Sequence, residues 1–172
     1  MRTAILLLVV LALSLGASAQ TANLWVDTNG GTCTRQATPA AYVDAAACSS
    51  MQAAQTAASA GDTIRIKNGT YGSQSISSGG KANYVNFYAE TAGSVLVGGL
   101  SISVDYVKVT GVIGSGTGNS RGSLTLEGNY ILIDGFHGST MSGAWNNLAT
   151  GKHDWTIQNC EFGGNDTALY ST

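Results

Sequence analysis

Short runs of alternating apolar and polar residues recur along the chain at a nearly constant interval. Val107 and Val109 align with Ile131 and Ile133, and the same interval leads from Ile133 to Ile157. Successive side chains of a β-strand point to opposite faces, so each run predicts a strand with one buried face. A repeat of roughly 20 to 25 residues with such strands and glycine turns is typical of a solenoid, whose coils bury their apolar faces by stacking.

The repeat extends beyond these strands in both directions. Tyr106 and Tyr130 align at the same interval, and we expect them to pack on each other. Before Val107 and Val109, the repeat continues back to Val85 and Phe87, and these align in turn with Ile64 and Ile66. A second set of columns comprises Leu100, Ile102, Leu124, Leu126 and Leu148. The sequence therefore predicts an all-β solenoid of stacked coils.

The segment before the first repeat predicts a cap for one end of the solenoid. Residues 24–27 are expected to form a short strand, and Ser49 or Ser50 is a suitable N-cap for a helix that follows. Gly61 is placed to end this helix as its C′ residue. The apolar face of the predicted helix consists of Met51, Ala54, Ala57 and Ala58.

The first residues of the chain read as a secretory signal. Arg2 supplies a positive charge, residues 4–13 are an unbroken apolar stretch, and small residues follow at 17–19. The apolar stretch is too short for a transmembrane span, although an uncleaved anchor is the alternative. We expect cleavage after Ala19, which divides the chain into a signal peptide (1–19), an N-terminal strand, loop and capping helix (20–62) and solenoid coils (63–172), with no membrane span in the mature protein.

Composition narrows the classes of partner. Charged residues make up only 10% of the chain, and the formal net charge is −2. This weak negative balance provides no basic patch for nucleic acid and no polybasic signal for anionic lipid, so we expect no nucleic-acid partner. Gly occurs 23 times and Pro once, as in a protein rich in β-strands and turns.

The cysteines indicate an oxidising compartment. Cys33 and Cys48 stand on either side of a loop, and a disulfide between them suits a secreted protein. Cys160 is left over, either as a small buried residue or as one whose partner is missing. No CxxC pair or Cys/His cluster indicates zinc.

Residues 50–71 resemble the N-terminal cap and first coil of the pectate-lyase-like right-handed parallel β-helix superfamily. In that group an Ala-rich helix plugs the solenoid and is followed by a Gly-Asp-Thr-Ile strand and a Gly-Thr-Tyr turn, as at residues 61–64 and 69–71 here. Residues 155–162 are similar to the coil phrase of the same group. The resemblance implies a right-handed parallel β-helix with an N-terminal capping helix. A leucine-rich repeat is disfavoured by the absence of its asparagine and leucine spacing, and a propeller or sandwich would need hairpin turns at shorter intervals.

The resemblance also implies a carbohydrate-related role outside the cell. Many members are polysaccharide lyases or glycoside hydrolases that act on uronates, so we expect the N-terminal part of such a secreted enzyme, with an extracellular polysaccharide as its partner. Other members are non-catalytic surface proteins or adhesins that bind glycans, and the fold does not choose between the two. No C-terminal cap is recognisable before Thr172, so we expect further coils, the catalytic ones included, to follow that residue.

Four outward-facing residues are the candidates for catalysis. A lyase of this group would need a base that removes a proton beside a carboxylate, and a cation, often calcium, that neutralises the carboxylate. Lys108, Asp134, His137 and Glu161 could form one patch with an amine, an imidazole and two carboxylates, which is a set able to abstract a proton. An ordinary solvated face accounts for the same residues. Calcium needs several converging oxygens, so the sequence by itself assigns no metal ligands. No other cofactor is evident, and calcium would be expected only if the protein is a lyase.

Overall fold

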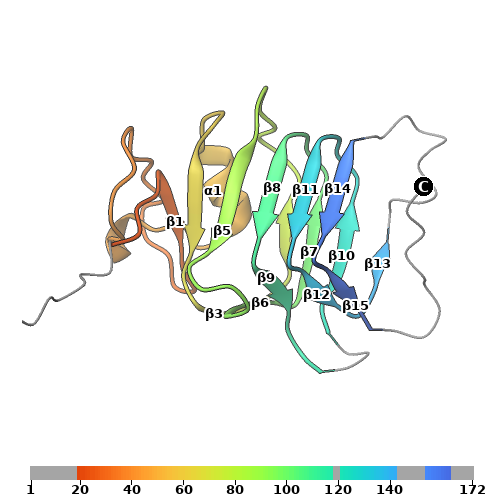
Figure 1. Cartoon of the computed structure of the whole chain (residues 1–172). Helices are drawn as coiled ribbons and strands as arrows, with labels where there is room; N and C mark the ends of the chain where they lie inside the picture. Colours follow the sequence, from red (N-terminus) through yellow and green to blue (C-terminus); the bar gives the residue numbers. More distant parts are fainter. Residues whose placement is uncertain (1–18, 118–120, 143–153, 164–172) are drawn as a thin grey trace, which may run out of the picture.

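Three parallel sheets run along the molecule, and successive turns of the chain add strands to them in rotation (Figure 1). The computed structural model describes residues 19–117, 121–142 and 154–163. The first sheet has the strand order β1-β2-β5-β8-β11-β14, the second β3-β6-β9 and the third β13-β10-β7-β4. All pairs of these strands are parallel, so the predicted solenoid architecture is confirmed.

The elements are short, as expected for one side of a coil. The first sheet comprises β1 (Leu24–Val26), β2 (Thr63–Ile66), β5 (Val85–Ala89), β8 (Val107–Thr110), β11 (Ile131–Asp134) and β14 (Trp155–Gln158). The second comprises β3 (Gly69–Tyr71), β6 (Val95–Val97) and β9 (Val112–Gly114). The third comprises β4 (Gln74–Ile76), β7 (Gly99–Ile102), β10 (Ser123–Leu126) and β13 (Met141–Ser142). The remaining elements are η1 (Asp44–Ala46), α1 (Met51–Ala57) and the strand pair β12 (His137–Gly138) and β15 (Glu161–Phe162), of which β12 contacts β9.

The stacked apolar columns form the interior. Ile133 lies beside Val109 on one side and Ile157 on the other, which confirms the predicted alignment of these strands. Val107 and Val109 are buried, whereas Lys108 between them faces outward and is partly exposed. Burying a Val, Leu or Ile side chain stabilises a fold by about 1.5–3 kcal/mol, so the repeated column contributes to stability in every coil.

Two registers differ from the predicted alignment. Ile64 lies beside Phe87, whereas the sequence alignment placed it beside Val85. A slip of two residues keeps the same side chains facing inward, so alternation by itself does not detect it. In the third sheet Met141 lies beside Leu124, in the column assigned to Leu148, which is outside the described residues.

Helix α1 packs against β1 and β4 at the N-terminal end of the solenoid and contributes Met51 and Ala54 to the core. Of the two predicted N-caps, Ser50 is the one observed, and its hydroxyl accepts a hydrogen bond from Ala53 N at 3.1 Å. The amide of Met51 donates to Gln74 Oε1 at 3.0 Å. These two bonds satisfy N–H groups that the first turn of a helix leaves without partners.

Asp62 fixes the turn between α1 and β2. Its buried carboxylate accepts two hydrogen bonds from the Arg35 guanidinium, at 2.6 and 2.7 Å, and one from Ser59 N at 2.8 Å. The chain is already extended at Ala58, so the prediction that Gly61 is the C′ residue of the helix is wrong. The bonds to Asp62 draw the chain off the helix axis before it reaches that glycine.

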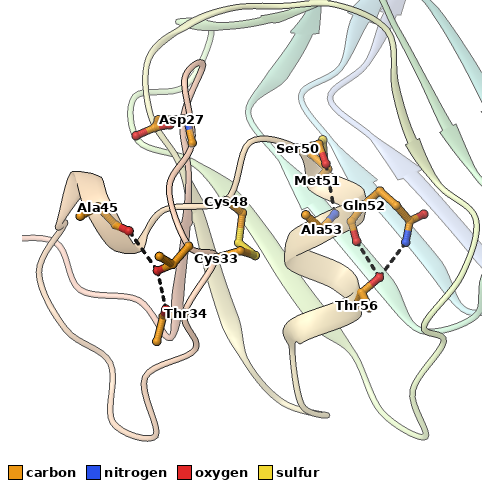
Figure 2. The surroundings of a disulfide bond; sticks show 12 residues. Asp27, Cys33, Thr34, Ala45, Cys48, Ser50, Met51, Gln52, Ala53 and Thr56 are labelled. Carbon is orange, nitrogen blue, oxygen red and sulfur yellow. Dashed lines mark hydrogen bonds between the residues drawn. A yellow bond between two sulfur atoms is a disulfide. The ribbon is translucent and has the colours of Figure 1, made fainter.

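A disulfide joins Cys33 and Cys48, as predicted, with an S–S distance of 2.05 Å (Figure 2). Cys48 is buried and is also held by the main chain of β1, because its N–H donates to Trp25 O at 2.7 Å and its carbonyl accepts from Asp27 N at 3.0 Å. Thr34 N donates to Ala46 O at 2.9 Å. The loop is therefore fastened to the first strand of the solenoid.

Two predictions from the sequence, the signal peptide and the right-handed winding, are not tested by the described residues. Residues 1–18, which hold most of the predicted signal, are outside the described part of the chain. Within that part, no helix is long and apolar enough to span a membrane. The right-handed winding implied by the resemblance stays a prediction.

Candidate functional site

Charged side chains are distributed unevenly among the sheets. Of the described strand residues, those of the second and third sheets include no Asp, Glu, Lys or Arg, whereas the first sheet carries Arg65, Lys108 and Asp134. The pair β12–β15 adds His137 and Glu161. All three charged residues of the first sheet occupy outward positions, so its outer face is the candidate site.

One row of polar side chains crosses this face from strand to strand. Neighbouring strands place successive members about 4.8 Å apart, so the row is a continuous polar strip. In order from β2 to β14, the members of the polar row are Arg65, Tyr88, Thr110, Asp134 and Gln158.

Two cations flank the aromatic ring in the polar row. Arg65 Cζ lies 5.9 Å and Lys108 Nζ lies 5.6 Å from the centre of the Tyr88 ring. Cation–π contacts at exposed sites are worth about 0.5–1 kcal/mol each, so the ring helps to hold both side chains on the face. The result is two positive charges held against one aromatic ring.

Two atoms of the polar row retain unused hydrogen-bonding capacity. Arg65 Nε and Thr110 Oγ1 are buried and have no hydrogen-bond partner within the described part of the chain. They lie on the two strands that border Tyr88 in the register. Buried polar atoms are paired in most proteins, so an unpaired donor and hydroxyl beside one ring are compatible with a polar ligand.

Asp134 is tied to its neighbours on β14 and the turn after it. Its Oδ1 accepts from Asn159 Nδ2 at 2.8 Å, and its Oδ2 accepts from Gln158 Nε2 at 3.1 Å. These bonds, assisted by the charge of Lys108 and opposed by partial burial, hold the pKa of Asp134 below its ordinary value. A general base works best with a pKa near the working pH, so Asp134 is suited to supplying negative charge and poorly suited to taking a proton.

The four residues predicted as one catalytic patch fall into two pairs. Lys108 and Asp134 share the outer face of the first sheet, and His137 Nδ1 lies 3.4 Å from Glu161 Oε2 across the β12–β15 pair. Gly135, with φ +77°, turns the chain between the two sheets. Within the described residues, no hydrogen bond or ion pair links one pair to the other.

Arg65 and Tyr88 were missed by sequence reasoning, which considered only the columns from Lys108 onward. The signal was available, because both residues occupy outward positions between buried neighbours in β2 and β5. The misaligned register of the first coil placed Arg65 beside Asn86 instead of Tyr88. The observed register brings the two cations to one ring.

Neither a metal site nor a reactive thiol stands out in the described segments. They contain no group of three His, Cys, Asp or Glu side chains arranged to hold a metal ion. Cys160 is a free cysteine that packs against the core, and burial raises the pKa of its thiol. A thiol with a raised pKa is a poor nucleophile at neutral pH.

Comparison with protein-family models, with curated proteins and with solved structures finds no match to this chain. The resemblance to pectate-lyase-like proteins therefore rests on the sequence motifs quoted above.

Proposed function

We propose that this protein is secreted and binds acidic polysaccharides outside the cell through the outer face of its first sheet. The observation that carries the proposal is the pair of cations, Arg65 and Lys108, held against Tyr88 on an otherwise lightly charged protein. A guanidinium and an ammonium are the groups that bind carboxylates most strongly, and the Tyr88 ring holds both of them on one face of the sheet. The sequence resemblance to proteins that act on uronates supports the same class of ligand.

Secretion is supported by two features of the chain. Residues 1–19 have the composition of a signal peptide, and the Cys33–Cys48 disulfide is of the kind that persists in oxidising compartments. An extracellular polysaccharide is also a polymer with a repeating unit, which suits a long flat face built from repeated strands. We also propose that the protein is a pectate-lyase-like β-helix and that its coils wind to the right.

Binding of the purified secreted protein to a panel of polyuronates and neutral polysaccharides tests the proposal. We expect binding to the acidic polymers only, and a loss of about tenfold in affinity for Lys108→Met, which corresponds to about 1.4 kcal/mol. Lys81→Met is the matched control, because Lys81 lies on the loop before β5, outside the first sheet. Equal affinity for neutral polymers, or an equal loss in both variants, would exclude this face as a site for acidic glycans.

Polysaccharide cleavage is the second candidate function, and the His137–Glu161 pair favours it. A carboxylate that binds one nitrogen of an imidazole orients the ring and leaves the other nitrogen available for proton transfer. The His137 side chain is 43% exposed, so the imidazole ring is accessible from solvent. A hydrolase or lyase acting at this corner would use the neighbouring cations to hold its acidic substrate, and a lyase would use calcium as well.

Product analysis separates cleavage from binding. The secreted protein is incubated with polyuronates, with and without calcium, and unsaturated ends (from a lyase) and reducing ends (from a hydrolase) are measured. If the protein is an enzyme, His137→Ala abolishes product formation and leaves polymer binding unchanged. Binding without any product would leave glycan binding as the function of this chain.

A further inference from the structure

We propose that the mature protein begins with a pyroglutamate formed from Gln20. The proposal is independent of the glycan-binding face and rests on cleavage after Ala19, which the small residues at 17–19 predict. Cleavage there would leave Gln20 as the first residue, with a free α-amine beside its own side-chain amide. That arrangement is the precursor of a five-membered lactam.

The structure leaves Gln20 free to react. Regular pairing begins at Ala22, which is buried and whose N–H and carbonyl bond the carbonyl and N–H of Ala40 at 3.0 and 2.8 Å. Residues 19–21 precede this anchor and are exposed. Ring closure at Gln20 therefore requires no change in the strands or the core.

The side-chain amide of Gln20 makes one hydrogen bond, from Nε2 to the carbonyl oxygen of Glu90 at 3.1 Å. A single exposed hydrogen bond of this kind adds little net stability because water competes for both partners, so it does not hold the amide away from the α-amine. The neutral α-amine attacks the amide carbon Cδ, the new N–Cδ bond closes the ring, and the Cδ–Nε2 bond breaks. The leaving nitrogen takes a proton and departs as ammonia, so no oxidant, reductant or other reactant is needed.

The lactam would occupy an open groove on the surface of the N-terminal region. Gln20 lines this groove together with Trp25, Tyr42 and Glu90. The Lys67 ammonium, at 4.6 Å from the centre of the Tyr42 ring and 2.5 Å from Glu90 Oε1, already places one positive charge there. Cyclisation replaces a second positive charge with a neutral ring, so the modified N-terminus adds no cation beside Lys67.

Amine labelling before proteolysis tests the proposal on the secreted protein. Free amines are dimethylated on the intact protein, which is then reduced, alkylated and digested with trypsin. Cleavage after Arg35 yields the peptide of residues 20–35. We expect this peptide to carry no label and to be lighter by the mass of one ammonia. Dimethylation before digestion prevents a free Gln20 from cyclising later during handling.

The matched variant is Gln20→Asn, which keeps a side-chain amide but would need a strained four-membered ring. Its N-terminal peptide is expected to be fully labelled. A labelled wild-type peptide that starts at Gln20 would refute cyclisation while confirming the cleavage site. An N-terminal peptide that starts at any other residue would refute the proposal at its first step.

Discussion

Replacing Cys33 and Cys48 by alanine removes the covalent link that closes the loop before helix α1. The cysteines are separated by 15 positions, and in the chain-entropy description a link of this span stabilises the folded state by about 3 kcal/mol at 25 °C. For a chain of this size, each 1 kcal/mol corresponds to roughly 2–4 °C in Tm, so we expect a fall of about 6–12 °C. The native fold is expected to persist, because hydrogen bonds to Trp25 O and from Asp27 N still hold the loop to β1.

Urea denaturation followed by far-UV circular dichroism measures this effect. Either single replacement should cost as much as the double one, because one cysteine suffices to break the link. Cys160→Ala is the control, since Cys160 is unpaired, and it should change the free energy of unfolding far less. A double variant within about 0.5 kcal/mol of wild type would refute the argument, because distant surface changes reach that size without any cross-link.

The remaining predictions concern the core, the turns and pH. Phe87→Ala removes a fully buried ring and should cost about 3–5 kcal/mol in the free energy of unfolding, whereas Val43→Ala, at a side chain 58% exposed, should stay within about 0.5 kcal/mol. Gly135→Ala should lower the free energy of unfolding by about 1–2 kcal/mol, because a φ of +77° strains any residue with a Cβ. Gly111→Ala should lower it further, since the new Cβ would also lie 3.1 Å from a neighbouring main-chain atom. Urea denaturation compares the two variants. Burial opposes ionisation of Asp62, but its hydrogen bonds hold the pKa of the carboxyl below its ordinary value. Its contribution to stability is therefore present above about pH 4 and is lost as the pH falls through the folded-state pKa. Thermal melts from about pH 6 to about pH 2 check the direction, and a rise in Tm on acidification would contradict it.

Repetition made the later coils predictable from the sequence. Val109, Ile133 and Ile157 stack as expected because each coil from β8 onward repeats the same alternation at the same interval. The aligned tyrosines confirm the same register, since the rings of Tyr106 and Tyr130 stack with their centres 4.5 Å apart. Where a repeat is regular, inward and outward positions follow directly from the period.

The first coil was less predictable because its register depends on contacts outside the repeat. Asp62 O accepts the N–H of Asn86, and its carboxylate binds Arg35 from the preceding loop, so tertiary contacts set where β2 begins. Alternation at Ile64 and Ile66 is equally consistent with a slip of two residues. The same limit concealed one member of the site, because Arg65 lies beside Tyr88 only when β2 and β5 are correctly aligned.

The most direct test of the account is to map where an acidic oligosaccharide binds the folded protein by NMR. Titration of the labelled protein with a short oligouronate should shift the signals of Arg65, Tyr88 and Lys108 and leave those of Ser75 and Ser101, on the outer face of the third sheet, unchanged. Shifts centred on the third sheet, or no shifts at saturating oligouronate, would contradict the claim that the first sheet presents the glycan-binding face.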